Sequence, residues 1–358
     1  MNNYLFRFMV LGLLPLYLSG CSHRGSQRDI VFPSSFVVDT LYPVTSVKSQ
    51  GRSSNCWAYS MASFFETEYL QCFPKDTLEI SAEYIVRRNY ELRFDDFCRT
   101  YGDTKKLSRG GLGHTFLRAT RAYGLLPLSD YRADTLRADY TKLMKSIRKL
   151  ARNALSSPSA RIENRHRLTS LLDEKMGKLP MKEGNVDSRY AALLFLRRFP
   201  ASGKQYIQLT SFMDSPYYRN RLLHLPDNTE QVPFYNIPLD QLINLMKAAL
   251  ENGYTFVWDG DISEPGFSVR KGIAVLPQTA LVNDSTRLEG YLSGETTDNH
   301  MMHIVGMAHD ENGESFFIAK NSYGKKGAYH GYIYLSETYV RLKTISILLD
   351  EKSLKLIQ

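Results

Sequence analysis

The chain has 358 residues, 43% of them hydrophobic and 12% aromatic, which is ample material for the core of one large domain or two interlocked domains. The formal net charge is +8, but the Lys and Arg residues are scattered along the chain instead of forming one stripe. We therefore expect no nucleic acid as a partner, because nucleic-acid-binding proteins gather their basic residues on one surface.

The first 20 residues have the pattern of an export signal and are not expected to belong to the fold. Arg7 supplies a positive charge, and residues 8–18 form an apolar run too short to span a membrane comfortably. Residues 18–21 read LSGC, which looks like a bacterial lipobox with cleavage before Cys21 and lipid attachment to its thiol. This pattern predicts an exported lipoprotein, anchored at a membrane and facing the periplasm or the cell exterior, with residues 21–35 as a tether. The alternative is an ordinary signal peptide in which Cys21 is incidental.

The segment 50–57, QGRSSNCW, sets Cys56 six residues after Gln50 and at the start of an apolar helical pattern. Unpaired N–H groups and the positive end of the dipole stabilise a thiolate at a helix N-terminus, so this pattern predicts a reactive Cys56 near neutral pH. The side-chain amide of Gln50 is placed to stabilise an oxyanion together with the backbone N–H of Cys56. The alternative is that Cys56 is a small buried residue without chemistry.

Composition divides the rest of the chain into three parts. Residues 36–128 hold the Cys56 helix, a helix near 81–93 and a glycine turn followed by a helix that ends at Gly124. Residues 129–236 are charged with few strand signals, which predicts a helical insertion over a cleft. Its basic stretch is interpreted as a solvated helix face, with a patch for anionic lipid or acidic substrate as the alternative.

The third part, 237–358, begins with a predicted helix at 239–252. Strands are predicted after it at 254–258, 271–276, 300–308, 315–320 and 331–335. The sequence therefore predicts an α+β fold in which a helical lobe packs against a β-rich lobe, with the active site between them.

Two of these strands carry a histidine and an asparagine. The turn-rich residues 310–313 separate them, which predicts a β-hairpin with His300 on its first strand and Asn321 at the end of its second. A neutral amide beside an imidazole holds the tautomer that accepts a thiol proton, which is the Cys-His-Asn variant of the catalytic triad. His303 points to the opposite side of the strand and is interpreted as a core or surface residue.

With these motifs in this order, the chain resembles the papain-like cysteine peptidases, and among them the bleomycin hydrolase or aminopeptidase C branch. The resemblance covers nearly all of residues 36–350 and rests on the segments 47–60, 109–113, 209–212, 253–258, 300–306 and 320–324. It implies that Cys56 is the nucleophile, His300 the general base and acid, Asn321 its orienter and Gln50 the oxyanion donor. Two departures are Tyr323, where the family usually has Trp, and a C-terminus without an evident match to the tail that blocks the cleft in that branch.

The resemblance also implies a substrate site. It assigns Gly110, Gly111 and Trp258 to substrate binding. At the two glycines, backbone without Cβ lets an extended peptide approach closely. Asp259 and Asp261 follow the Trp258 strand and could attract a free peptide N-terminus, but a solvated turn is the preferred interpretation, because Asp and Gly gather at turns for turn chemistry alone.

The expected function is that of a cysteine aminopeptidase acting on peptides through a covalent thioester. The alternatives are an endopeptidase or peptide-amide hydrolase, and an inactive lipoprotein that binds peptides. No cofactor or metal is expected, because no Cys/His cluster has zinc-ligand spacing. Cys72 and Cys98 are either a disulfide or buried thiols, and the oligomeric state stays open.

Overall fold

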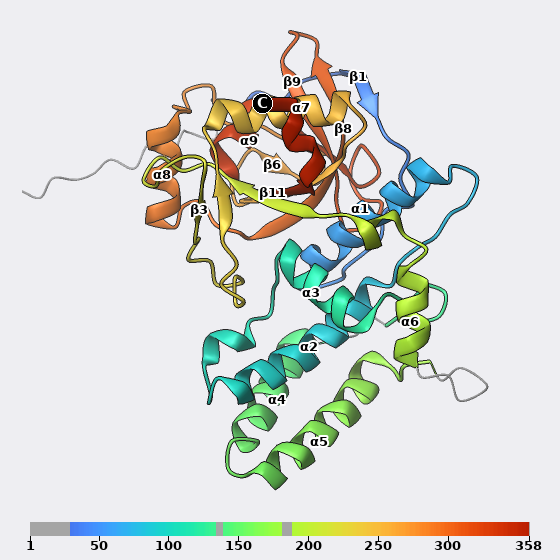
Figure 1. Ribbon diagram of the computed structural model, residues 1–358. Coiled ribbons are helices and arrows are strands. Elements are labelled where there is room, and N and C mark those ends of the chain that lie inside the picture. The colour runs from blue at the N-terminus through green and yellow to red at the C-terminus, as the bar shows by residue number, and fades with distance from the viewer. Residues whose placement is uncertain (1–28, 134–138, 181–187, 358) are drawn as a thin grey trace, which may run out of the picture.

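Two lobes meet along a central helix, α1 (Cys56–Cys72), in the computed structural model (Figure 1). The structure describes residues 29–133, 139–180 and 188–357. One lobe consists of helices, and the other is built on a mixed β-sheet with helices on its outer face. The predicted α+β class with a helical and a β-rich lobe is confirmed. Cys21 and the predicted signal sequence lie outside the described residues.

Helices α2 to α6 form the helical lobe, in which α2 and α3 pack on α1, α4 and α5 pack on α2, and α6 packs on α3. Their bounds are α2 (Ala82–Arg99), α3 (Gly113–Tyr123), α4 (Tyr140–Asn153), α5 (Pro158–Met176) and α6 (Ser188–Leu196). Local sequence explains several of their ends. The Ser81 hydroxyl accepts a hydrogen bond of 3.2 Å from the N–H of Tyr84 and caps α2, while α3 ends where Gly124 adopts a positive φ of 75°. The helix predicted at 81–93 is therefore present but extends to Arg99.

Helix α1 has no solvated face, although its sequence predicts only one apolar face. Every residue from Trp57 to Leu70 is buried, because the sheet covers one side and other helices the rest. Its polar side chains are satisfied internally: the fully buried Glu66 accepts hydrogen bonds from Lys48 Nζ at 2.7 Å and from the N–H of Ile80 at 2.6 Å. A buried charge is tolerable only with such partners, so this network fixes α1 against the loops before it.

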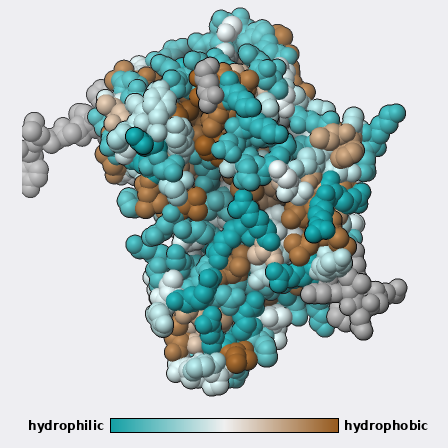
Figure 2. Space-filling view, in the orientation of Figure 1, coloured by the Kyte–Doolittle hydropathy of each residue, from teal (hydrophilic) through white to brown (hydrophobic). Residues whose placement is uncertain are grey.

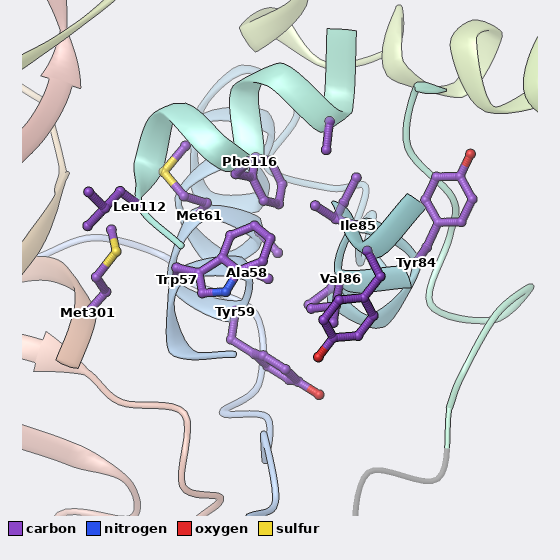
Figure 3. Close-up of a cluster of buried hydrophobic side chains, with 14 of the residues drawn as sticks. Trp57, Ala58, Tyr59, Met61, Tyr84, Ile85, Val86, Leu112, Phe116 and Met301 are labelled. Carbon is purple, nitrogen blue, oxygen red and sulfur yellow. The ribbon is translucent and has the colours of Figure 1, made fainter. Parts of the chain in front are cut away.

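The start of α1 is packed between helices and sheet (Figure 3). Trp57 is 1% exposed and lies beside Leu112 at the start of α3, while Met301 reaches the same cluster from strand β8 (His300–Asp310). Phe116 of α3 and Ile85 of α2 fill the space on the helical side. This close packing gives the first turn of α1 one fixed position relative to the sheet.

All strands of the described residues belong to one sheet with the order β3-β4-β2-β11-β5-β8-β9-β10-β7-β6, and β1 pairs with β8 off this path. Strand bounds are β1 (Phe36–Leu41), β2 (Tyr206–Thr210), β3 (Arg219–Arg221), β4 (Phe234–Asn236), β5 (Phe256–Gly260), β6 (Phe267–Ser268), β7 (Ile273–Ala274), β9 (Ser315–Lys320), β10 (Tyr332–Ser336) and β11 (Thr344–Asp350). Strands β8 and β9 form the predicted hairpin. Its central place beside β5 puts the start of β8 next to the first turn of α1.

The prediction that residues 129–236 form a helical insertion is wrong for its second half, which contains strands. The last helical turn before the sheet is the 3₁₀ helix Pro200–Gly203, and β2, β3 and β4 then join the sheet through β11. β3 (RNR) is polar, but β2 (YIQLT) and β4 (FYN) carry aromatic and β-branched residues typical of strands, a signal that the predicted insertion overlooked. Pairing extends the sheet from the apolar strand β11 to β2, then to β4 and β3.

The outer face of the sheet is covered by α7 (Leu239–Glu251) and α9 (Glu337–Lys343), with α8 (Asp284–Ser293) beside them (Figure 1). A second apolar cluster fills this layer, and it contains Trp258, which is 0% exposed and donates from Nε1 to Thr344 Oγ1 at 2.7 Å. The C-terminal turns Glu351–Ile357 pack against α7 on this side of the sheet. On the face seen in Figure 2, apolar patches are interrupted by hydrophilic side chains.

Cys56, Cys72 and Cys98 are free thiols, with Cys72 exposed and Cys98 buried. Of the two alternatives for the last pair, the disulfide is therefore wrong, and a buried thiol is confirmed for Cys98 but not for Cys72. No helix within the described ranges is both long and apolar enough to cross a membrane.

Candidate active site

Cys56 is the first residue of α1 and opens into a cleft of about 780 Å³ between the lobes. It is half-buried, and the N–H groups of Met301 and Trp57 hydrogen-bond to its sulfur. The cleft is lined by residues of the loops 50–54, 103–111, 222–231 and 298–301, together with Arg148 of α4 and Tyr323. The predicted nucleophile therefore lies at the junction of the lobes, with α4 contributing to the opposite wall.

His300 and Asn321 form the predicted pair. The Nε2 atom of His300 lies 2.8 Å from Oδ1 of Asn321, which also accepts a 2.7 Å bond from the N–H of Ser322. An amide oxygen only accepts, so Nε2 of the neutral imidazole carries the hydrogen and Nδ1 presents its lone pair. This is the tautomer that a base for the Cys56 thiol requires.

Tyr323 touches the same imidazole. Its hydroxyl lies 3.3 Å from Nδ1 of His300, and the two rings are 4.8 Å apart between centroids with an interplanar angle of 30°. Because Nδ1 holds the lone pair, the phenol is the donor in this contact. Tyr323 therefore shields the ring as the Trp expected from the sequence resemblance would, and adds a hydroxyl that binds the basic nitrogen.

Burial keeps both reacting groups neutral. It raises the pKa of the Cys56 thiol to about 12, with the carboxylates of Asp259 and Asp227 adding to the increase and hydrogen bonds from Met301 and Trp57 opposing it. Burial also lowers the pKa of His300 to about 4, against the bond to Asn321. The sequence pattern counts the helix N-terminus and not the desolvation of the sulfur, and these two effects shift the thiol pKa in opposite directions, so a stabilised thiolate stays a prediction.

Gln50 is buried and lines the cleft beside Cys56. Its Nε2 donates to the carbonyl of Ser53 at 2.6 Å, and its Oε1 accepts from the hydroxyl of Ser322 at 2.6 Å. An amide NH₂ carries two hydrogens, so one is available to a substrate oxygen while the other orients the group. The side chain is thereby fixed by residues on both sides of the cleft.

His303 lies away from the cleft. It is fully buried, its Nδ1 lies 2.9 Å from the hydroxyl of Ser63, and Phe64 meets its ring edge-on at 5.8 Å between centroids. Burial, with the nearby Lys320 ammonium, lowers the pKa of His303 well below its usual value. Its interpretation as a core residue agrees with this position between α1 and the sheet.

The predicted substrate residues divide into two groups. Gly110 and Gly111 line the cleft, where a Cβ on Gly110 would lie 1.8 Å from Oδ2 of Asp227 and one on Gly111 2.9 Å from the ring of Trp57. These glycines therefore allow close packing of the cleft wall itself. Trp258 lies in the core on the far face of the sheet, so its assignment to substrate binding is wrong: alternation along β5 sends the next residue, Asp259, to the cleft side.

Asp261 has a structural role. Its carboxylate accepts hydrogen bonds from Ser263, Thr297 and Asn299 at 2.5 to 2.9 Å; the bonds from Ser263 and Thr297 lower its pKa against the effect of burial. It connects the loop after β5 to the loop before β8. The turn interpretation therefore describes Asp261 better than a substrate role.

Sequence reasoning missed two acidic residues of the cleft, Asp227 and Asp298. Asp227 comes from the loop between β3 and β4, and Asp298 precedes His300 by two positions. The one local signal was the position of Asp298 beside a candidate catalytic histidine. Within the described ranges, no group of three or more His, Cys, Asp or Glu side chains is arranged to hold a metal ion.

A helix that begins at a cysteine and packs on a sheet bearing a His–Asn pair defines the papain-like fold. Consistent with this, the chain is similar to the crystal structure of PepW from Lactobacillus rhamnosis HN001, with a TM-score of 0.68 and 16% sequence identity over 93% of this chain and 85% of that chain. A looser similarity, with a TM-score of 0.43 and 14% identity over 86% of this chain and 67% of the other, is to a structure from work on the mite allergens Blo t 1 and Der p 1. No family model and no curated protein sequence matches the chain.

Proposed function

We propose that the protein is a cysteine peptidase of the papain-like fold. The observation that carries this proposal is the convergence of Cys56, His300 and Gln50 on one cleft, with the His300–Asn321 bond of 2.8 Å fixing the base tautomer. Peptide binding alone requires neither a nucleophile nor an oriented base, which argues against an inactive binding lipoprotein.

In the proposed reaction the Cys56 sulfur attacks the scissile carbonyl carbon while its proton passes to Nδ1 of His300. The resulting oxyanion is stabilised by the first N–H of α1, which has no partner within its helix, and by Nε2 of Gln50. His300 then returns the proton to the departing amine, which leaves a thioester on Cys56. Water, deprotonated by the same nitrogen, hydrolyses the thioester and restores the thiol.

We further propose an aminopeptidase of the bleomycin hydrolase type. Support comes from the sequence segments that resemble this branch, and the cleft beside Cys56 is lined by the loops 103–111 and 222–231 and by Arg148 of α4. The C-terminal residues 351–357 pack against α7 on the outer side of the sheet and do not line this cleft. An amino-terminal preference must therefore come from other residues of the cleft. An endopeptidase or peptide-amide hydrolase remains the alternative.

An epoxide affinity label for cysteine peptidases tests the chemistry, with Cys56→Ala as the control. We expect labelling at Cys56 in the parent protein alone, and turnover of fluorogenic peptides with a free amino terminus but not of their N-blocked counterparts. Cleavage of blocked peptides would assign the endopeptidase alternative. Absence of both labelling and turnover under reducing conditions would instead favour the peptide-binding lipoprotein.

We also propose that the chain is exported and anchored at a membrane through lipid on Cys21. The support is the sequence of residues 1–21, with its basic, apolar and lipobox segments in order. Labelling of cells with a fatty-acid analogue tests this, with Cys21→Ser as the control. A soluble product that is insensitive to globomycin would refute the anchor.

A further inference from the structure

Three carboxylates lie close together near Cys56, two in the cleft wall and one buried behind it. Asp227 and Asp298 line the cleft directly. Asp259 pairs with Met301 across strands β5 and β8, so both side chains project from the same face of the sheet, and Met301 lines the cleft next to Cys56. The three residues come from the β3–β4 loop, β5 and the loop before β8, and only the tertiary fold brings them together.

The buried carboxylate of Asp259 lacks a hydrogen-bond partner for one of its two oxygens. It is 1% exposed, its Oδ2 accepts a 3.2 Å bond from the hydroxyl of Ser346, and its Oδ1 is buried without a hydrogen-bond partner. The Oδ2 atom of Asp298 is also buried and unpartnered. A buried carboxylate oxygen without a hydrogen-bond partner lowers the stability of the fold. Two such oxygens close together are expected where a ligand donates hydrogen bonds to them.

The local charge points to the kind of ligand. Among the residues that the structure describes, none of the three carboxylates forms an ion pair, and Asp227 is held by the hydroxyl of Ser108. Burial raises the pKa of Asp259 well above its usual value and that of Asp298 to about 7, and the neighbouring carboxylates raise both further. Like charges resist ionisation together, and a positive group between them would remove that repulsion and release protons.

We propose that Asp227, Asp259 and Asp298 form a subsite for a positively charged nitrogen of the peptide substrate, an ammonium or guanidinium group held beside the reacting sulfur. This inference rests on the proposed peptidase function and names the substrate class of the same cleft. The cation is either the free α-amine of the peptide or a Lys or Arg side chain close to the scissile bond. Both present N–H donors that match the vacant carboxylate oxygens.

Equilibrium binding separates this subsite from the chemistry. The full chain carrying Cys56→Ala is titrated with short peptides labelled at the C-terminus, which carry Lys or its neutral analogue norleucine at each position in turn. Every peptide is made with a free and an acetylated amino terminus. We expect at least tenfold tighter binding of the cationic member of a pair at pH 8, where the carboxylates are ionised more fully. A preference lost on acetylation assigns the α-amine, and one that follows Lys assigns a side chain.

The matched variants are Asp259→Asn and Asp298→Asn, each in the Cys56→Ala background, with Glu289→Gln as the control. Glu289 is an exposed carboxylate on α8, outside the cleft. We expect the cationic preference to fall below threefold in the two Asp variants and to stay unchanged in the control. Should Asp259→Asn fail to fold by near-ultraviolet circular dichroism, Asp298→Asn decides, because it lies at the cleft surface.

The outcomes distinguish the two proposals. Equal binding of charged and neutral peptides, or an undiminished preference in the folded Asp variants, overturns the subsite even if the wild-type enzyme cleaves peptides. Selective binding of cations by a protein without turnover or Cys56 labelling retains the subsite and overturns the peptidase.

Discussion

The hydroxyl of Tyr323 lies 3.3 Å from Nδ1 of His300, the nitrogen that must accept the thiol proton in the proposed reaction. By donating a hydrogen bond to the Nδ1 lone pair, the phenol stabilises the neutral imidazole and competes with the thiol proton for that lone pair. We expect Tyr323→Phe, which removes only the hydroxyl, to raise the rate of Cys56 alkylation by iodoacetamide about 3- to 10-fold at pH 7, the effect of one hydrogen bond of about 1 kcal/mol.

The control for this substitution is Tyr332→Phe, which removes a hydroxyl from β10, outside the cleft. An unchanged or slower alkylation rate in Tyr323→Phe would show that the phenol does not restrain the base. Tyr323→Trp tests shielding separately, because it introduces the aromatic residue that papain-like cysteine peptidases usually have here, without a hydroxyl.

The rate at which Cys56 is alkylated should rise with pH, as it does for a thiol that is neutral at pH 7. With a pKa of about 12 for Cys56 and about 4 for His300, neither group is charged between pH 6 and 9 in the free enzyme. The thiolate fraction then rises about tenfold for each pH unit, and so does the rate with iodoacetamide. A thiolate–imidazolium pair would instead give a rate that is constant down to acidic pH. Stopped-flow labelling between pH 5 and 9 distinguishes the two curves, with Cys56→Ala reporting the background from Cys72 and Cys98.

The triad could be predicted from sequence because each member has a local signature. Cys56 starts a helical pattern, and His300 and Asn321 belong to two strands joined by a short turn, so their proximity follows from hairpin geometry. The protonation state of Cys56 could not be predicted in the same way. It depends on how completely the sheet and the Trp57 cluster exclude water, which is a property of tertiary packing.

The proposed acidic subsite shows a second limit of prediction from sequence. Strand β5 is buried on both faces, so nothing in its sequence tells that Trp258 faces the outer core and Asp259 the cleft. Asp227 reaches the site from a loop between two short strands that sequence assigned to a helical insertion. Residues whose position depends on pairing between distant segments carry no local signal of their role.

His303 should affect stability and not chemistry. His303→Ala removes the partner of Ser63 and leaves a cavity beside Phe64, so we expect a loss of about 2–4 kcal/mol in the free energy of unfolding, with Cys56 labelling retained below the unfolding transition. His300→Ala should keep the fold and abolish turnover. Urea denaturation measures the stability of both variants, and peptide assays measure their activity. If the folded His303→Ala variant lost turnover while His300→Ala kept it, His303 and not His300 would be the catalytic base.

The same histidine should give stability a pH dependence. Its pKa is lowered in the folded state, so below about pH 6.5 the unfolded chain binds a proton that the native protein does not. The contribution of the neutral His303 to the free energy of unfolding is therefore complete above pH 6.5. It falls by about 1.4 kcal/mol for each pH unit below that value. The difference in unfolding free energy between the parent and His303→Gln, measured from pH 7 to 5, should shrink as the pH falls. A constant difference would mean that His303 titrates alike in the folded and unfolded states, so that its pKa is not lowered by folding.

Gly110 should be required for the position of Asp227. A Cβ at this residue would lie 1.8 Å from Oδ2 of Asp227, and the carboxylate, as the end of a short side chain, must move away and leave Ser108. We expect Gly110→Ala to lower the free energy of unfolding by about 1 kcal/mol, the value of one hydrogen bond, and to weaken the binding of cationic peptides to the Cys56→Ala protein. Gly203→Ala is the matched control, because its Cβ would enter open space. If both substitutions leave cation binding equally intact, Asp227 does not belong to the subsite, and Asp259 and Asp298 alone must hold the positive charge.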